Sequence, residues 1–351
     1  MTAASPWWTR QSHADRRPVL MMRAKVVAAL RAHFAAQDFV EVETAALQVS
    51  PGNETHLRAF STQILAPDGS SAPLHLHTSP EFGCKKLVAA GETRLVTVAR
   101  VFRNGERSAL HHPEFTMLEW YRAGADYTVL MQDCADVIAR SAEVAGTGIL
   151  SHRGREADPL APFDRLTLAE AFARYAGIDL FASIAADGAT DRDALAEAVA
   201  AAGIRVAPDD SWSDLFSRVL VARIEPHLGI GRPAILYEYP ACEAALARRS
   251  ARDARVAERF ELYACGVELA NAFGELTDPV EQRRRFEADM ALKARIYGEA
   301  YPIDEDFLAA LAAMPETSGI ALGLDRLVML LAGAPRIEDV IWTPVADTLP
   351  R

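Results

Sequence analysis

Residues 101–122 read VFRNGERSALHHPEFTMLEWYR, and this stretch decides the fold. It contains the end of one strand, a polar loop rich in Arg and His, and a second strand. Because side chains alternate along a strand, one face of the second strand carries Phe115, Met117, Glu119 and Tyr121. A face that mixes aromatic side chains with a carboxylate suits a pocket better than a core. A solvated hairpin with a surface ion pair is the alternative.

The sequence on either side of this stretch predicts an α+β fold. Before it, we expect helices over 18–37 and 80–91, strands over 39–44 and 95–103, and a hairpin over 59–77. After it, we expect helices over 127–145, 211–228, 279–299 and 325–333, and strands over 234–240, 255–264, 266–276 and 318–324. This order predicts an antiparallel β-sheet flanked by helices, in one domain over residues 1–351. Residues 146–215, rich in Ala, Asp and Gly, are expected to form a helical insertion within it.

The composition is that of a globular protein. Of the 351 residues, 50% are apolar and 24% are charged, and the net charge is 37 − 48 = −11. This acidic balance argues against a protein whose main task is binding nucleic-acid phosphates. Neither a secretory signal nor an apolar membrane-spanning stretch is recognisable. The four scattered cysteines predict reduced thiols in the cytoplasm.

A second stretch, FELYACGVELANAFGEL at 260–276, predicts a cation site. A turn at Cys265-Gly266 divides it into two strands, so that Glu261 and Glu268 converge. Carboxylates that converge in a cleft are natural ligands for Mg²⁺, which also binds substrate phosphates. Exposed sheet carboxylates are the alternative, although the apolar neighbours indicate a largely buried segment that needs cations or donors.

A third stretch, SGIALGLDRLVMLLAG at 318–333, predicts an anion site. A strand ends at Gly323, and Arg326 lies at the start of the following helix, where the helix dipole favours anions. A buried strand–helix junction with Arg326 in a salt bridge is the alternative. Together, the three stretches offer two arginines, two carboxylates, an aromatic ring and an acidic pocket. That set is suited to an enzyme that uses ATP to adenylate a carboxylic acid, where the substrate also carries a positively charged group.

Several of these motifs resemble those of a known family. FRN…HHPEFTMLEWYR is similar to motif 2 of class II aminoacyl-tRNA synthetases of the lysyl branch, SGIALGLDRLVML to motif 3, and residues 18–37 with FVEVET to motif 1. Only 17 residues precede the first expected helix, so we expect no anticodon-binding domain. The chain therefore most resembles the elongation factor P–lysine ligases, which attach (R)-β-lysine to a lysine of elongation factor P; TSPEF and ELANAFGELTD are also similar to that family.

The resemblance implies a class II catalytic core, ATP and Mg²⁺ as cofactors, and a homodimer, with tRNA not expected as a partner. It implies that Arg103 holds the α-phosphate of ATP, that Phe115 stacks on adenine and that Arg326 binds the γ-phosphate. It places the other nucleotide contacts at Asn104, Gly105, His111, His112, Leu269 and Gly323. Glu261 and Glu268 are the implied Mg²⁺ ligands.

The resemblance also implies an amino-acid site. Ser79, Pro80 and Glu81 bind the backbone end of β-lysine or lysine, with Glu81 meeting the amino group. The side-chain pocket is formed by Glu119, Tyr121, Asn271 and Glu275. Ala321 stands where lysyl-tRNA synthetases have Gly, which implies a pocket reshaped toward β-lysine.

Two positions depart from the family pattern, and two other functions stay open. Glu106 stands one residue later than the usual motif 2 Glu, so that Glu106 or the Gly105 backbone makes its adenine contact. Ala45 replaces the Pro that ends motif 1, which leaves the dimer interface less defined. The alternatives are a truncated lysyl-tRNA synthetase that charges tRNA, and an inactive regulatory paralogue. The sequence identifies no general base for the transfer of the activated amino acid.

Overall fold

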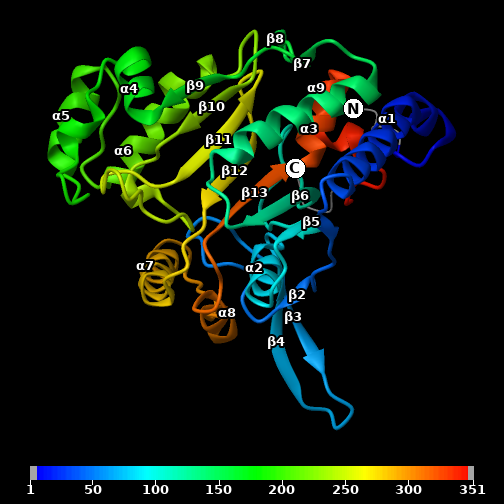
Figure 1. The fold of residues 1–351 in the computed structure, drawn as a ribbon, viewed down its shortest axis with the longest axis horizontal. Coiled ribbons are helices and arrows are strands. Elements are labelled where there is room, and N and C mark those ends of the chain that lie inside the picture. The colour runs from blue at the N-terminus through cyan, green and yellow to red at the C-terminus, as the bar shows by residue number, and fades with distance from the viewer. Residues whose placement is uncertain (1–5, 347–351) are drawn as a thin grey trace.

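An eight-stranded sheet forms the centre of the computed structural model, which describes residues 6–346 (Figure 1). Its strands, in spatial order, are β1 (Val40–Glu41), β5 (Arg94–Phe102), β6 (Glu114–Ala123), β13 (Thr317–Gly323), β12 (Val267–Gly274), β11 (Arg259–Ala264), β10 (Ala234–Tyr237) and β9 (Asp164–Thr167). Neighbouring strands from β5 to β10 are antiparallel, whereas β1 and β9 pair in parallel at the two edges. The predicted antiparallel sheet flanked by helices is confirmed.

Two small sheets lie outside the central one. The first contains β2 (Leu47–Gln48), β3 (Ser61–Leu65) and β4 (Ser71–Leu76), and its β3–β4 hairpin, which the turn residues predicted, projects from the body of the molecule (Figure 1). The second contains β7 (Leu150–His152) and β8 (Arg155–Ala157). The predicted strand over 39–44 is reduced to the two residues of β1.

Three helices cover one face of the central sheet: α1 (Arg10–Ala35), α3 (Val129–Ala145) and α9 (Leu324–Ala332) (Figure 1). They bury alternate strand residues such as Trp120, Leu118 and Ile320. Helix α1 begins eight residues before its predicted start, because Thr9 caps it and Pro18 is accommodated within it. Proline removes one helical hydrogen bond. The turn before Pro18 is held to the C-terminal segment by Arg16, whose side chain donates to the main-chain oxygen of Glu338.

The opposite face is covered in part by α2 (Glu81–Ala89), α7 (Pro279–Tyr297) and α8 (Glu305–Leu311). Phe82 and Phe307 stack there with ring centres 3.9 Å apart, beside Tyr121 of the sheet. The sequence did not predict α8, which has only seven residues. None of the helices within 6–346 is long and apolar enough to cross a membrane.

Residues 146–215 contain strands as well as helices, so the expectation of a helical insertion needs correction. The segment includes β7, β8 and β9 together with α4 (Leu168–Ala176), α5 (Arg192–Ala201) and the first residues of α6 (Trp212–Val219). Strand β9 lengthens the central sheet by pairing Leu166 with Leu236 of β10. Four residues are too few to show strand alternation, which explains why the sequence did not indicate it. The helices form an apolar cluster at this end of the sheet (Figure 1).

The remaining elements are single turns. Helix α6 continues as a π-helical turn over Leu220–Ile224 and a 3-10 turn over Glu225–His227. Further 3-10 turns span Leu180–Ser183, Ala241–Glu243 and Ile337–Val340.

Candidate active site

A cavity of about 410 Å³ lies on the sheet face that α1, α3 and α9 leave uncovered. Strands β6, β11, β12 and β13 form its floor, because alternation directs one set of their side chains away from the apolar core. The floor residues include Phe115, Met117, Glu261, Leu269, Asn271, Ala321 and Gly323. The pocket face expected on β6 is therefore confirmed for its first two residues, Phe115 and Met117.

Arg103, directly after β5, and Phe115, in β6, both face the cavity. The guanidinium carbon of Arg103 lies 5.3 Å from the centre of the Phe115 ring. Arg103 Nε donates to the main-chain oxygen of Thr78 over 3.3 Å, which leaves its terminal nitrogens for a ligand. A cation therefore stands beside an aromatic face, an arrangement that suits an anion attached to a planar ring.

Arg326 faces the same cavity from the start of α9. It donates to the main-chain oxygens of Leu110 and Glu268 over 3.2 and 2.9 Å, and to His111 Nε2 over 2.8 Å. A guanidinium only donates, so His111 Nε2 carries no proton and Nδ1–H donates to Ser108 Oγ. Burial lowers the pKa of His111, and Arg326 lowers it further. The neutral imidazole thus leaves Arg326 as the cation at this end of the cavity.

Asp325, beside Arg326, anchors the start of α9. Its carboxylate pairs with Arg23 of α1, and its Oδ2 accepts the Thr116 N–H over 2.7 Å. Both members of the ion pair are buried, so removing either would leave an unpaired charge in the core. The pair therefore holds Arg326 in place relative to β6. Sequence reasoning did not identify this contact, which joins distant segments.

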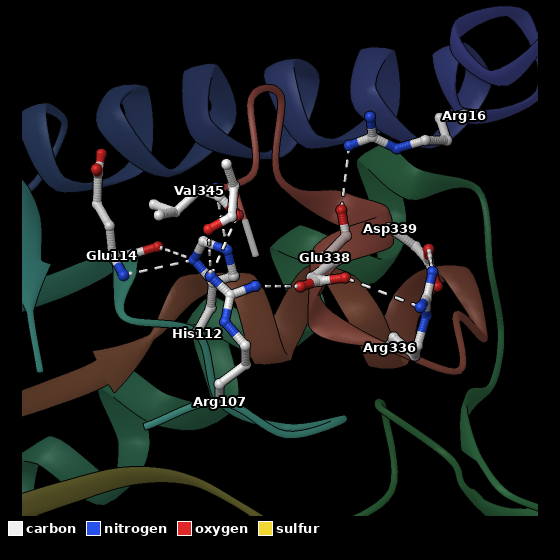
Figure 2. A network of polar contacts seen from close by, with 9 residues as sticks. Arg16, Arg107, His112, Glu114, Arg336, Glu338, Asp339 and Val345 are labelled. Carbon is white, nitrogen blue, oxygen red and sulfur yellow. Dashed lines mark hydrogen bonds and ion pairs between the residues drawn. The ribbon is translucent and has the colours of Figure 1, made fainter. Parts of the chain in front are cut away.

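His112 connects the polar loop to the C-terminal segment (Figure 2). Its Nδ1 lies 2.6 Å from the main-chain oxygen of Glu114, and its Nε2 accepts the Val345 N–H over 3.3 Å. Arg107 adds an ion pair with Glu338 at 3.0 Å (Figure 2). His112 borders the cavity, yet both ring nitrogens are used by the main chain, so its observed contacts are structural.

Three further loop residues occupy different environments. Asn104 and Gly105 lie in an exposed turn, where Gly105 adopts a positive φ of 81°. The Asn104 N–H donates to the main-chain oxygen of Arg58 over 2.7 Å. Glu106 borders the cavity. Of the two predicted replacements for the motif 2 Glu, the Glu106 side chain is thus the one that reaches the cavity.

Glu261 and Glu268 both line the cavity, as the predicted turn requires. Cys265 and Gly266 make that turn with φ of 56° and 72°. Glu261 is buried and accepts hydrogen bonds from Arg259 over 2.7 Å and Tyr263 over 2.6 Å. The side chain of Glu268 is 42% exposed and lies 3.7 Å from Arg326. Desolvation within the cavity raises the pKa of Glu268, and Glu261 adds to the shift.

This carboxylate pair does not form a complete metal site by itself. Within 6–346, no group of three or more His, Cys, Asp or Glu side chains is arranged to hold a metal ion. Two carboxylates next to an anion site nevertheless fit Mg²⁺, which prefers oxygen ligands and commonly takes the rest from phosphates and water. Glu268 is the more available ligand, because both oxygens of Glu261 already accept hydrogen bonds.

A buried acidic cluster lies next to the cavity wall. Glu119 is fully buried; Ser79 donates to its Oε1, and the Tyr121 hydroxyl donates to its Oε2 over 2.8 Å. Burial raises the pKa of Glu119 to about 8, and Glu81 contributes to the shift. Glu119 is therefore poised to ionise when a cation arrives beside it.

Lys85 balances part of this acidic cluster, and sequence reasoning missed it. Its Nζ lies 2.5 Å from Glu81 and 2.6 Å from Glu275, and both Lys85 and Glu275 are almost fully buried. Burial acts to lower the pKa of Lys85, but Glu275 and Glu81 outweigh it and raise that pKa. Only the i, i+4 spacing of Glu81 and Lys85 on α2 signalled part of this network.

Two backbone features make room for the cluster. Pro80 precedes α2 at its N-cap position, so that Glu81 is the first helical residue. Gly319 of β13 lies against Glu275 and Tyr121, and a Cβ at this position would overlap both side chains. The predicted amino-acid residues thus divide into two groups. Ser79, Glu81, Asn271 and Ala321 line the cavity, whereas Glu119, Tyr121 and Glu275 are buried beside it.

Comparisons with known proteins agree with the motifs. The family model for class II tRNA synthetases (D, K and N) matches residues 7–347. An elongation factor P–(R)-β-lysine ligase of Proteus mirabilis is 39% identical over 349 residues, covering 98% of this chain and 99% of the relative. A protein with the same name from Sodalis glossinidius is 40% identical over 324 residues, covering 92% of this chain and 93% of the relative. Another from an Enterobacter species is 40% identical over 331 residues, covering 92% of this chain and 94% of the relative.

Proposed function

Because the chain belongs to the elongation factor P–(R)-β-lysine ligases of the class II tRNA synthetase family (D, K and N), we propose that it is an ATP-dependent ligase with the same reaction. It activates (R)-β-lysine, or lysine, as an aminoacyl-adenylate and joins it to a lysine side chain of elongation factor P. One observation carries this proposal: Arg103, Arg326 and Glu268 line one cavity whose wall adjoins a buried acidic cluster.

The two arginines define the triphosphate end of the proposed site. Arg103 binds the α-phosphate, with adenine against Phe115, and Arg326 binds the γ-phosphate at the N-terminus of α9. Other residues proposed to line or support the nucleotide site are Asn104, Gly105, Glu106, His111, His112, Leu269 and Gly323. In the first step the amino-acid carboxylate attacks the α-phosphorus, and pyrophosphate leaves; Arg103 stabilises the charge that develops.

Glu268, with Glu261, is proposed to hold Mg²⁺ together with the phosphates. The ion supplies charge neutralisation for the departing pyrophosphate. Glu268 also lies 3.7 Å from Arg326, so this carboxylate keeps the guanidinium oriented while both contact the same substrate.

The acidic cluster is proposed to select the amines of the amino acid. Ser79, Pro80 and Glu81 receive its backbone end, while the side-chain amine reaches the pocket of Glu119, Tyr121, Asn271 and Glu275. Lys85 already neutralises part of the charge of Glu81 and Glu275, so Glu119 is the acid of this cluster that has no ionic partner within residues 6–346. A cationic amine entering there supplies the missing charge, and a neutral side chain does not.

A direct test combines the protein with ATP, Mg²⁺, (R)-β-lysine and elongation factor P, and follows intact mass. A mass increase on elongation factor P equal to one β-lysyl group supports the proposal. A parallel reaction with tRNA tests the truncated synthetase alternative: label on RNA and none on protein would overturn the proposal. Pyrophosphate exchange tests the inactive alternative, since no exchange with any lysine isomer would favour a binding module.

A homodimer and a cytoplasmic location are also proposed. Val40, Leu47 and Val49, in the segment that follows α1, are each about half exposed, and such apolar side chains suit a subunit contact. Light scattering at micromolar concentration tests the dimer. The cysteines are unpaired, which fits a reducing compartment.

A further inference from the structure

Glu54 is a cavity-lining carboxylate that the reaction described above does not use. It lies in the loop between β2 and β3, outside all three motifs. Its Oε2 is buried and has no hydrogen-bond partner among residues 6–346. Three other acids of the cavity wall have partners: Glu81 pairs with Lys85, Glu261 accepts from Arg259 and Tyr263, and Glu268 faces Arg326. A buried carboxylate oxygen without a hydrogen-bond partner is costly, which points to a role in binding or catalysis.

The loop that carries Glu54 is held from several sides. Buried Lys293 of α7 donates to the main-chain oxygens of Thr55 and Glu54 over 3.0 and 3.4 Å. The Tyr301 hydroxyl accepts the Ala59 N–H over 2.8 Å. Gly52 has a φ of 122°, and a Cβ at this position would lie 2.7 Å from Glu54 Oε2. The backbone is therefore shaped to leave room for this carboxylate and to fix its position.

The neighbours of Glu54 locate it relative to the proposed reaction. Burial raises the pKa of Glu54, Glu81 and Asp289 add to the shift, and Arg103 opposes it. If Arg103 holds the α-phosphate and Glu81 meets the amino group, the activated carboxyl carbon lies between these two residues. Glu54 lines the same cavity as Arg103 and Glu81, on which basis we place it near the bond that breaks when the acceptor amine attacks. Two and four residues further on, His56 and Arg58 are exposed, so the loop leads from the cavity to the surface.

We propose that Glu54 is the general base of the transfer step and accepts a proton from the Nζ of the acceptor lysine. This role rests on the proposed function. Of the three protons on the acceptor ammonium, the amide keeps one. Glu54 accepts one before attack, and the other passes to solvent after attack. The Nζ lone pair forms the C–N bond, and the bond from the carbonyl carbon to the adenylate oxygen breaks, leaving its electron pair on AMP.

The test compares the wild type with Glu54→Gln in two reactions of the same adenylate. The adenylate is formed from ATP and (R)-β-lysine, then mixed in a single turnover with elongation factor P or with hydroxylamine. Hydroxylamine is uncharged at neutral pH and needs no base to become a nucleophile. We expect Glu54→Gln to slow transfer to elongation factor P by about 100-fold, the usual contribution of a general base. Hydroxamate formation should change far less.

Two controls keep this test specific. Glu92→Gln, at an exposed position, should keep both rates. Glu54→Asp should recover part of the transfer rate, and the pH at which transfer is half-maximal should rise in Glu54→Gln toward the value of the free amine. Equal losses with both nucleophiles, or a raised KM for β-lysine in pyrophosphate exchange, would assign Glu54 to substrate binding and overturn the base role. An unchanged transfer rate in Glu54→Gln would also overturn the base role. If the wild type forms hydroxamate but never modifies elongation factor P, the proposed acceptor is wrong instead.

Discussion

Replacing Glu119 by Gln should separate the stability of this protein from its activity. Glu119 is fully buried, and its pKa is raised from 4.5 to about 8. Between these values the folded protein keeps a proton that the unfolded chain has lost, so wild-type stability falls as pH rises through this window. Gln is neutral at every pH and keeps an oxygen that accepts from Ser79 or Tyr121. Glu119→Gln therefore loses this pH-dependent cost.

The size of the effect follows from the two pKa values. Each pKa unit corresponds to about 1.36 kcal/mol. Glu119 therefore lowers the free energy of unfolding of the wild type by about 1 kcal/mol at about pH 5 and by about 5 kcal/mol at about pH 8.5. As pH rises from about 5 to about 8.5, the free energy of unfolding of the variant should therefore rise by about 4 kcal/mol relative to that of the wild type. For a chain of 351 residues this corresponds to a change of roughly 5 °C in the difference between their Tm values.

Thermal melting at the two pH values, monitored by intrinsic fluorescence, measures this difference. Glu92→Gln, at an exposed site, provides the matched control and should show no pH-dependent gain. Pyrophosphate exchange with (R)-β-lysine should fall by about 10- to 100-fold in Glu119→Gln, because the amine loses its charged partner. A Tm difference between variant and wild type that stays constant with pH would refute the reasoning, since it would mean that Glu119 is ionised in the folded protein throughout.

Three further substitutions test other parts of the site. Glu268→Gln should reduce pyrophosphate exchange by about 100-fold and raise the Mg²⁺ concentration needed for half-maximal rate, and an unaltered Mg²⁺ dependence would contradict its role as a ligand. Ala321→Gly should shift the ratio of exchange rates from (R)-β-lysine toward α-lysine by about 10- to 100-fold, so an unchanged ratio would exclude this residue as the discriminator. Gly319→Ala should lower the free energy of unfolding by about 1–3 kcal/mol, because the added methyl overlaps Tyr121 and Glu275. The control is Gly148→Ala, whose methyl meets open space, and equal Tm values for the two variants would contradict the overlap.

The local sequence patterns determined the sheet and much of the cavity floor. Alternation along 114–122 placed Phe115 and Met117 on the cavity face, since the two-residue period depends only on neighbouring residues. The turn at Cys265-Gly266 likewise brought Glu261 and Glu268 to one cavity, and the strand–helix junction at 323–326 placed Arg326 there. These features need no knowledge of distant contacts.

Only the tertiary structure decided which charges meet. Lys85 pairs with Glu275, Arg23 pairs with Asp325, and Glu54 enters the cavity from a loop without a motif. Strand β9 and helix α8 were also missed, because four and seven residues are too short to show a period. Partners of buried charges are chosen by burial and geometry across the fold, where a low dielectric makes pairing necessary. That requirement acts between segments far apart in the chain, so no local pattern in the sequence records it.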